Sequence, residues 1–177
     1  MKRKWQRNWK QKLVKKLATP VLAGMMLLSS YNTVLANPSG GVVTAGEAAI
    51  STNGSTLTVN QTTNKAAINC QSFGIGSGET VRFIQPSTSS VALNRVVGGN
   101  ASAIYGTLSA NGKVFLINPN GILFAPGSQV NVGGLVASTL NLSDSDFLKG
   151  NYSFAKNGAA GSVVNQGAIR SADGGYV

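Results

Sequence analysis

The sequence predicts an all-β fold of many short strands, and three observations carry this prediction. The segment after residue 36 holds only 12 charged residues among its 141 positions, about a third of the density usual in globular domains. The same segment holds 21 of the 22 glycines of the chain. Short apolar runs alternate there with Gly, Asn and Pro turn signals. Such a chain has too few charges to coat amphipathic helices, whereas its Ser, Thr and Asn residues suit the surfaces and turns of sheets.

The best-defined element is a rigid turn, Asn118-Pro119-Asn120-Gly121, which is followed by Ile122. Asn first, Pro second and Gly fourth fit a type I turn, and Asn at the third position also tolerates a type II turn. The flanking runs, Lys113–Ile117 and Ile122–Ala125, are apolar on both alternating faces. Each flank therefore predicts a strand that is buried on both sides.

The other elements follow the same logic of apolar runs between turn residues. Asn53-Gly54 lies between two such runs and predicts a β-hairpin. The expected strands are Ala48–Thr52, Thr56–Asn60, Ala66–Phe73, Thr80–Ile84, Val91–Val97, Ser102–Leu108, Lys113–Ile117, Ile122–Ala125, Val130–Val132, Leu135–Ala137 and Thr139–Leu142.

One short helix is expected over Ser143–Lys149, with a protruding loop or hairpin as the alternative. Ser143 or Asp144 would cap its start, and Lys149-Gly150 would close its end.

A faint internal repeat indicates how the strands are arranged. Residues 118–130 and 165–177 align at an offset of 47, with five identical positions in thirteen. Two turns of a stacked β-coil, each of about 20–25 residues, would give this spacing. In a parallel β-helix, Asn residues at the turns and aliphatic residues inside stack from one coil to the next.

Residues 1–36 have the pattern of an export signal. Eight Lys and Arg residues and no acid precede an apolar stretch from Leu17 to Leu28. Cleavage is expected between Ala36 and Asn37, because small or branched residues suit signal peptidase. The apolar stretch is shorter than the ~20 residues of a membrane-spanning helix, and the cleavage site argues against a basic nucleic-acid arm.

The rest of the chain argues against an enzyme, a metal protein and a nucleic-acid-binding protein. The signal carries +8 of the formal charge of +10, so residues 37–177 carry only +2 and give no indication of nucleic acid as a partner. The chain has no His and only five scattered acids. Asp144 and Asp146 suit helix capping rather than catalysis. We therefore expect no catalytic residue, no metal site and no cofactor.

Cys70 is the only cysteine, so an intramolecular disulfide is impossible. It is expected to be a small, partly buried thiol. The absence of disulfides would also suit a chain that must stay unfolded while it crosses a second membrane.

Three segments resemble a known family. They are Leu93–Val96, Ile104–Ile122 and Leu135–Leu140, and in this order, behind a long basic signal, they resemble the N-terminal two-partner secretion domain of Gram-negative exoproteins. This domain is also known as the filamentous haemagglutinin-type or haemagglutination-activity domain. The resemblance covers about residues 42–177. An earlier Asn-Pro-Asn-Leu motif of the filamentous haemagglutinins is missing, and Ile104–Lys113 stands in its place. The chain therefore looks more like the high-molecular-weight adhesin branch.

The resemblance implies a right-handed parallel β-helix with an N-terminal β cap and extra-helical β elements over 37–177. It also implies the N-terminal piece of a longer, secreted or surface-associated exoprotein, exported through the general secretory pathway and an outer-membrane β-barrel transporter with POTRA domains. Other regions of such proteins bind host cells or neighbouring bacteria. On this reading Asn118–Ile122 is either a transporter contact or a structural corner. Asn94 and Arg95 are open to the same two readings.

Two other functions compete with this one. A stand-alone carbohydrate- or cell-binding adhesin module is the closer alternative. A polysaccharide-active enzyme is the second, because parallel β-helices also carry such enzymes, but the clustered carboxylates that they need are missing from the sequence.

Overall fold

The computed structural model describes residues 37–156, 158 and 161–177. The strands are β1 (Val42–Ala45), β2 (Ala48–Asn53), β3 (Thr56–Gln61), β4 (Lys65–Cys70), β5 (Thr80–Ile84), β6 (Val91–Val96), β7 (Ser102–Ile104), β8 (Thr107–Ala110), β9 (Lys113–Ile117), β10 (Ile122–Phe124), β11 (Gln129–Val132), β12 (Gly134–Ser138), β13 (Val163–Asn165) and β14 (Ala168–Ser171), with the helix α1 (Asp144–Lys149) between β12 and β13.

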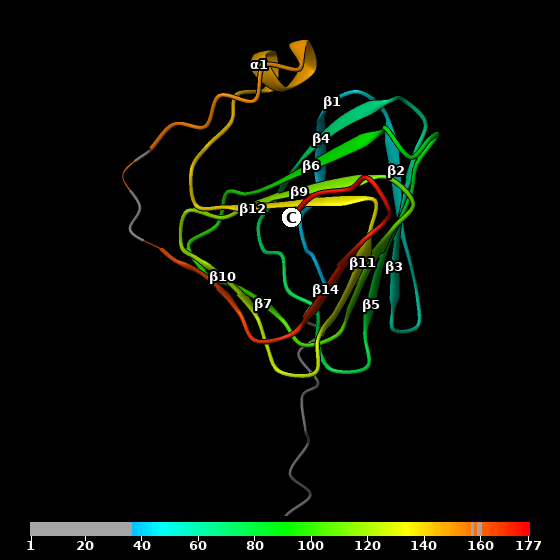
Figure 1. Cartoon of the computed structure of the whole chain (residues 1–177), viewed down its shortest axis with the longest axis vertical. Coiled ribbons are helices and arrows are strands. Elements are labelled where there is room, and N and C mark those ends of the chain that lie inside the picture. Colours follow the sequence, from blue (N-terminus) through cyan, green and yellow to red (C-terminus); the bar gives the residue numbers. More distant parts are fainter. Residues whose placement is uncertain (1–36, 157, 159–160) are drawn as a thin grey trace, which may run out of the picture. The chain divides into compact units, whose positions relative to one another are not determined.

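These strands form three sheets that wind around one interior (Figure 1). The sheet orders are β1-β4-β6-β9-β12, β13-β10-β7 and β14-β11-β8-β5-β3-β2. Three successive coils, β5–β7, β8–β10 and β11–β13, each give one strand to each sheet, and all these neighbours are parallel. At the first coil, β1 and β2 pair antiparallel with β4 and β3. The predicted right-handed parallel β-helix with an N-terminal β cap is confirmed.

The interior is built from stacked aliphatic side chains, one from each coil. Leu57, Val81, Leu108 and Val130 are in register on β3, β5, β8 and β11, and all four are buried. Because side chains alternate across a strand, the residues between them face outward. Burying each aliphatic side chain contributes about 1.5–3 kcal/mol to folding, so the stack fixes the register of the coils.

A glycine lets two coils approach closely at the corner before β12. The Gly133 N–H donates to the Gly112 carbonyl oxygen over 2.7 Å. A Cβ at Gly133 would lie 2.8 Å from that same oxygen, which is closer than side chains tolerate. The corner therefore accepts a close backbone contact that no other residue type allows.

Residues 139–156 leave the coil as an excursion that lies on the outer face of the β1-β4-β6-β9-β12 sheet. Phe147 of α1 is fully buried there against Phe115 of β9, with ring centroids 6.3 Å apart. Tyr152 packs edge-on against Phe115 at 4.9 Å. Asn141 and Ala155 form an antiparallel bridge, an extra-helical β element of the expected kind. The excursion thus buries the outer face of β9, whose other face lies in the interior of the β-helix.

The expected short helix is confirmed as α1. Ser143 is its N-cap and accepts a hydrogen bond from the Asp146 N–H, and Gly150 ends it with a φ of 79°. The αL conformation explains why glycine stands at this end. Within the described residues no helix is long and apolar enough to cross a membrane.

Two expectations about the strands are wrong. Ser102–Leu108 is not one strand, because the chain turns at Tyr105-Gly106 and continues as β8 in another sheet. Thr139–Leu142 is not a strand: Leu142 packs under the excursion, Leu140 is 37% exposed, and only Asn141 forms a bridge.

The alignment of 118–130 with 165–177 is also wrong. Val130 pairs with Ile169, 39 residues on, rather than with Val177. The two segments lie one coil apart, and the excursion lengthens that coil.

Candidate functional site

The Asn118–Ile122 turn forms the corner between β9 and β10. The Asn118 carbonyl accepts the Gly121 N–H at 3.1 Å and closes the turn. The Asn118 side-chain oxygen accepts the Asn120 N–H at 2.9 Å, so the side chain stabilises the same turn from within. Gly121 has a φ of 112°, which explains the glycine at the fourth position.

The same turn is hydrogen-bonded to the coils on both sides. The fully buried Asn118 amide donates to the Asn100 carbonyl and to Ser102 Oγ, both at 3.0 Å. Asn120 Nδ2 donates to the Gly98 carbonyl at 2.9 Å. Towards the following coil, the Pro119 carbonyl accepts the Gly161 N–H, and the Ile122 N–H donates to the Ser162 carbonyl. The geometry is that of a structural corner, and only Asn120 has an exposed side chain in it.

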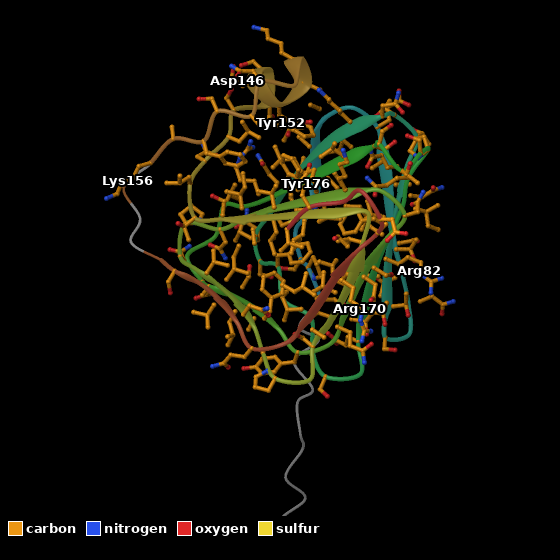
Figure 2. The ribbon with its side chains drawn as sticks, in the orientation of Figure 1. Arg82, Asp146, Tyr152, Lys156, Arg170 and Tyr176 are labelled. Carbon is orange, nitrogen blue, oxygen red and sulfur yellow. The ribbon has the colours of Figure 1, made fainter. Side chains whose placement is uncertain are left out.

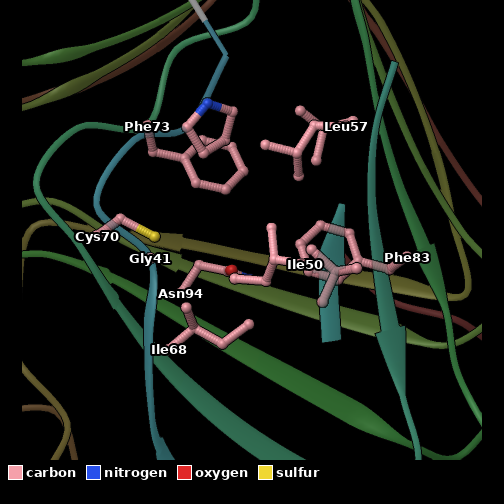
Figure 3. A pocket seen from close by; sticks show the side chains of 11 residues that line it. Gly41, Ile50, Leu57, Ile68, Cys70, Phe73, Phe83 and Asn94 are labelled. Carbon is pink, nitrogen blue, oxygen red and sulfur yellow. The ribbon is translucent and has the colours of Figure 1, made fainter. Parts of the chain in front are cut away.

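Asn94 points into the interior of the β-helix. Its side chain is 2% exposed, and it lines a cavity of about 20 Å³ beneath the N-terminal cap, together with Ile50, Leu57 and Cys70 among others (Figure 3). Its Nδ2 donates to the Ala92 carbonyl over a long 3.4 Å. A cavity of this size holds about one water molecule, so it offers no room for a small-molecule ligand. In the folded domain Asn94 is not accessible to a protein partner.

Arg95, the next residue, points the opposite way and holds the excursion. Its guanidinium donates to Asn69 Oδ1 at 2.8 Å, to Asn141 Oδ1 at 3.0 Å and to Asp144 Oδ1 at 2.7 Å. It also donates to the Leu142 carbonyl. The guanidinium thus joins two strands of the sheet to both ends of the segment that leads into α1. These contacts favour the structural reading of Arg95.

The charge pair with Arg95 changes the acidity of Asp144. Partial burial alone would raise the pKa of Asp144. Hydrogen bonds from Arg95 and Thr44 and the positive charge of Arg95 outweigh this effect and hold the pKa below its ordinary value. Asp144 is therefore ionised and bound at neutral pH, and its position in the first turn of α1 also suits the helix dipole.

Lys65 is a second cation in this arrangement that sequence reasoning did not identify. Its Nζ donates to the carbonyls of Phe147 and Leu148 at 3.0 and 2.9 Å and lies 5.7 Å from the Tyr152 ring centroid. Lys65 thereby caps the C-terminal end of α1, where the last carbonyls lack partners within the helix. The partners are more than 80 residues apart in sequence, and no local pattern marks them.

With this geometry established, the comparisons place the chain among known proteins. Residues 34–177 match the model of the TPS secretion domain. The chain belongs to the TPS secretion domain family. The crystal structure of the HMW1 secretion domain from Haemophilus influenzae is similar to it, with a TM-score of 0.72 and 34% identity, over 75% of this chain and 36% of that chain. The resemblance to the high-molecular-weight adhesin branch is in line with this match.

Two curated relatives are much longer than this chain. One heme/hemopexin-binding protein of Haemophilus influenzae is 43% identical over 144 residues, which are 80% of this chain and 16% of that protein. A second is 43% identical over 111 residues, which are 63% of this chain and 12% of that protein. The comparisons identify a non-enzymatic secretion domain.

The expected cleavage site lies at the edge of the described part of the secretion domain. Ala36 lies outside the described residues. Asn37 is 9% exposed, and neither polar atom of its side chain has a hydrogen-bond partner among the described residues.

Two further titratable groups, Glu79 and Cys70, are buried in the secretion domain. Glu79 is buried and accepts the Gly76 N–H at 2.7 Å. Burial raises the pKa of the Cys70 thiol to about 11, which suppresses the nucleophilic thiolate. No group of three potential metal-ligating side chains is found in the part of the chain that the structure describes.

Proposed function

We propose that residues 37–177 are the N-terminal secretion-targeting domain of a large exoprotein, and that an outer-membrane transporter with POTRA domains recognises it. The chain reaches the periplasm through the general secretory pathway, and signal peptidase cuts after Ala36. The domain then crosses the outer membrane, and its first coils nucleate the folding of the β-helix at the cell surface. Membership of the TPS secretion domain family supports this proposal.

The observation that carries the nucleation step is the cover on the first coil of the β-helix. There the antiparallel strands β1 and β2 pair with β4 and β3. The next coil adds parallel strands to this capped coil, as β5 does on β3 and β6 on β4. Each folded coil thus offers its strand edges to the coil that follows. Folding is therefore expected to begin at the capped first coil and to proceed towards later residues.

Recognition by the transporter precedes this folding. An unfolded chain has unpaired backbone groups, which can add as a strand to the edge of a POTRA sheet. In the folded corner the buried amide of Asn118 is fully used, whereas Asn120 is exposed. We assign Asn118 to the corner, and Asn120 is the residue of the turn at which a contact can be tested separately.

The test is a secretion assay in cells with and without the transporter, combined with refolding of the same proteins in vitro. Wild type is expected in the medium only when the transporter is present. Asn118→Ala is expected to refold poorly and to stay in the cell, because its partners Asn100 and Ser102 lose their hydrogen bonds. Export that does not need the transporter would contradict the proposal.

Asn120→Ala separates the two roles of the turn. A variant that refolds normally yet is not exported makes Asn120 a transporter contact. A variant that refolds and is exported limits the turn to its structural role.

The activity of the whole exoprotein is assigned to its other regions. We propose that these bind a host-cell or neighbouring bacterial surface, and that the protein is secreted or stays at the cell surface. The curated relatives are named as heme/hemopexin-binding proteins, but this domain spans only a small part of them. Cell binding by purified 37–177, together with export that does not need the transporter, would instead favour a stand-alone adhesin module.

A further inference from the structure

The outer face of the β14-β11-β8-β5-β3-β2 sheet is uncovered and polar. Outward positions on β3, β5, β8, β11 and β14 carry threonine, serine, asparagine and glutamine, apart from two arginines, Ile84 and Ala168. None of these outward positions carries a carboxylate or an aromatic ring. The face is therefore rich in hydrogen-bonding groups and has positive charge only.

The two arginines, Arg82 and Arg170, lie in one row that crosses this face. Thr58, Arg82, Ser109, Asn131 and Arg170 are successive partners on β3, β5, β8, β11 and β14. Three strand spacings separate the arginines, or about 14 Å. Figure 2 shows both on the same side of the domain.

Both guanidinium groups are available to a ligand. Arg82 and Arg170 are exposed, and neither forms a hydrogen bond or an ion pair with another of the described residues. The one ion pair among those residues joins Arg95 to Asp144 on a different sheet. Asp173 lies only three residues after Arg170 in sequence, but the two side chains do not form an ion pair.

A shallow and open hollow of about 350 Å³ lies beside Arg170 at the corner that follows β11 and β14. Asn131, Gly133, Arg170 and Ser171 are among its lining residues. Arg170 thus has amide and hydroxyl groups beside it in a shallow depression, whereas Arg82 is not among the residues that line it.

We propose that this face binds a linear acidic polysaccharide. One uronate lies in the hollow, where its carboxylate pairs with the Arg170 guanidinium and its hydroxyls bond to Asn131 and Ser171. A second carboxylate about 14 Å further along the polymer pairs with Arg82, at the spacing set by three strands. Guanidinium groups pair with carboxylates in a planar, two-bond geometry.

The low positive charge of this face favours a polyuronate over duplex DNA. A polyuronate carries one carboxylate per sugar, whereas duplex DNA carries a charge every 1.7 Å or so along its axis and is bound by many cations. Single-stranded nucleic acid binds through aromatic rings that stack on its bases, and the outward positions of this face have none. The proposal is independent of the export function, because it concerns the folded domain.

The experiment measures binding of purified residues 37–177, which lack the eight Lys and Arg residues of the export signal, to immobilised polygalacturonate. Variant Arg82→Gln/Arg170→Gln removes two charges from this face, and Lys149→Gln/Lys156→Gln removes two from exposed positions elsewhere. The arginine variant is expected to bind at least about tenfold more weakly, and the lysine variant within about twofold of wild type. Wild-type binding is expected to weaken with added salt. Thermal unfolding checks that both variants fold.

Four outcomes would overturn the proposal. The first is a wild type that does not bind polygalacturonate. The second is an equal loss in the lysine variant, which would mean that net charge rather than this face decides binding. The third is equal binding to pullulan, a neutral polysaccharide. The fourth is stronger competition by duplex DNA than by free polygalacturonate.

Discussion

Two outer faces of the same β-helix differ in what they expose. The face of β4, β6 and β9 carries Leu93, Phe115 and Ile117, and residues 139–156 cover it. The face of β5, β8 and β11 carries hydroxyl, amide and guanidinium groups and has no cover. Both sheets send aliphatic residues into one shared interior. The outward residues alone therefore decide whether a side of the solenoid recruits a second layer.

This difference can be recognised in the strands themselves. On β9 every residue from Val114 to Ile117 is buried, whereas on β5 the buried residues Val81 and Phe83 alternate with exposed ones. A run without alternation means a strand covered on both sides. In a solenoid with few charges, such runs identify the side that an excursion will cover.

The largest effect is expected when the covering layer loses its central side chain. Phe147→Ala leaves a cavity against Phe115 and should lower the free energy of unfolding by about 3–5 kcal/mol. Urea denaturation measures this loss. Leu148→Ala, next in sequence but 47% exposed, is the matched control and should stay within about 0.5 kcal/mol of wild type. If Phe147→Ala lowers the free energy of unfolding no more than Leu148→Ala does, packing of the excursion does not stabilise the domain.

A smaller effect is expected when residues 139–156 lose their hydrogen bonds to Arg95. Arg95→Met leaves Asp144 and the Leu142 carbonyl without their donor and should cost about 2–3 kcal/mol. Arg82→Met changes the same residue type on the uncovered face, where nothing binds it, and should cost less than about 0.5 kcal/mol. If the two variants unfold at the same urea concentration, the contrast between the faces is wrong.

The smallest effect is the pH dependence of the stability that Asp144 contributes on the covered face. The folded pKa of Asp144 lies below its ordinary value of 3.8. The contribution of ionised Asp144 to the free energy of unfolding is therefore present above about pH 4. It is lost as the pH falls through the pKa that Asp144 has in the folded state. Asp144→Asn should thus lose less stability than wild type between pH 5 and pH 3, measured by urea denaturation at each pH. The difference is small, because the side chain is 33% exposed and solvent screens the pair. If the free energy of unfolding falls equally in the two proteins between pH 5 and pH 3, Asp144 is not the source of that fall.

Local patterns in the sequence predicted much of the fold. Asn53-Gly54 predicted the β2–β3 hairpin, and Ser143 with Gly150 predicted both ends of α1. Turn chemistry and capping depend on a few neighbouring residues, so a single sequence reveals them. The corner at Asn118 was foreseen for the same reason.

Contacts between distant segments could not be predicted in this way. Lys65 meets α1 across 82 residues, and Arg95 meets Asp144 across 49. The sequence around each of these residues gives no indication of its distant partner. The Tyr105-Gly106 corner was missed because the residues on both sides have strand character. The repeat was misaligned because the excursion, residues 139–156, lengthens one coil.

The interior position of Cys70 makes the chain its own reporter of folding. The thiol is 2% exposed, its pKa is raised to about 11, and no second cysteine is present in the chain. Alkylating reagents attack the thiolate, so a maleimide should modify the extended chain quickly and the closed β-helix very slowly. Timed labelling would then follow, without any engineered probe, when the first coils close during export.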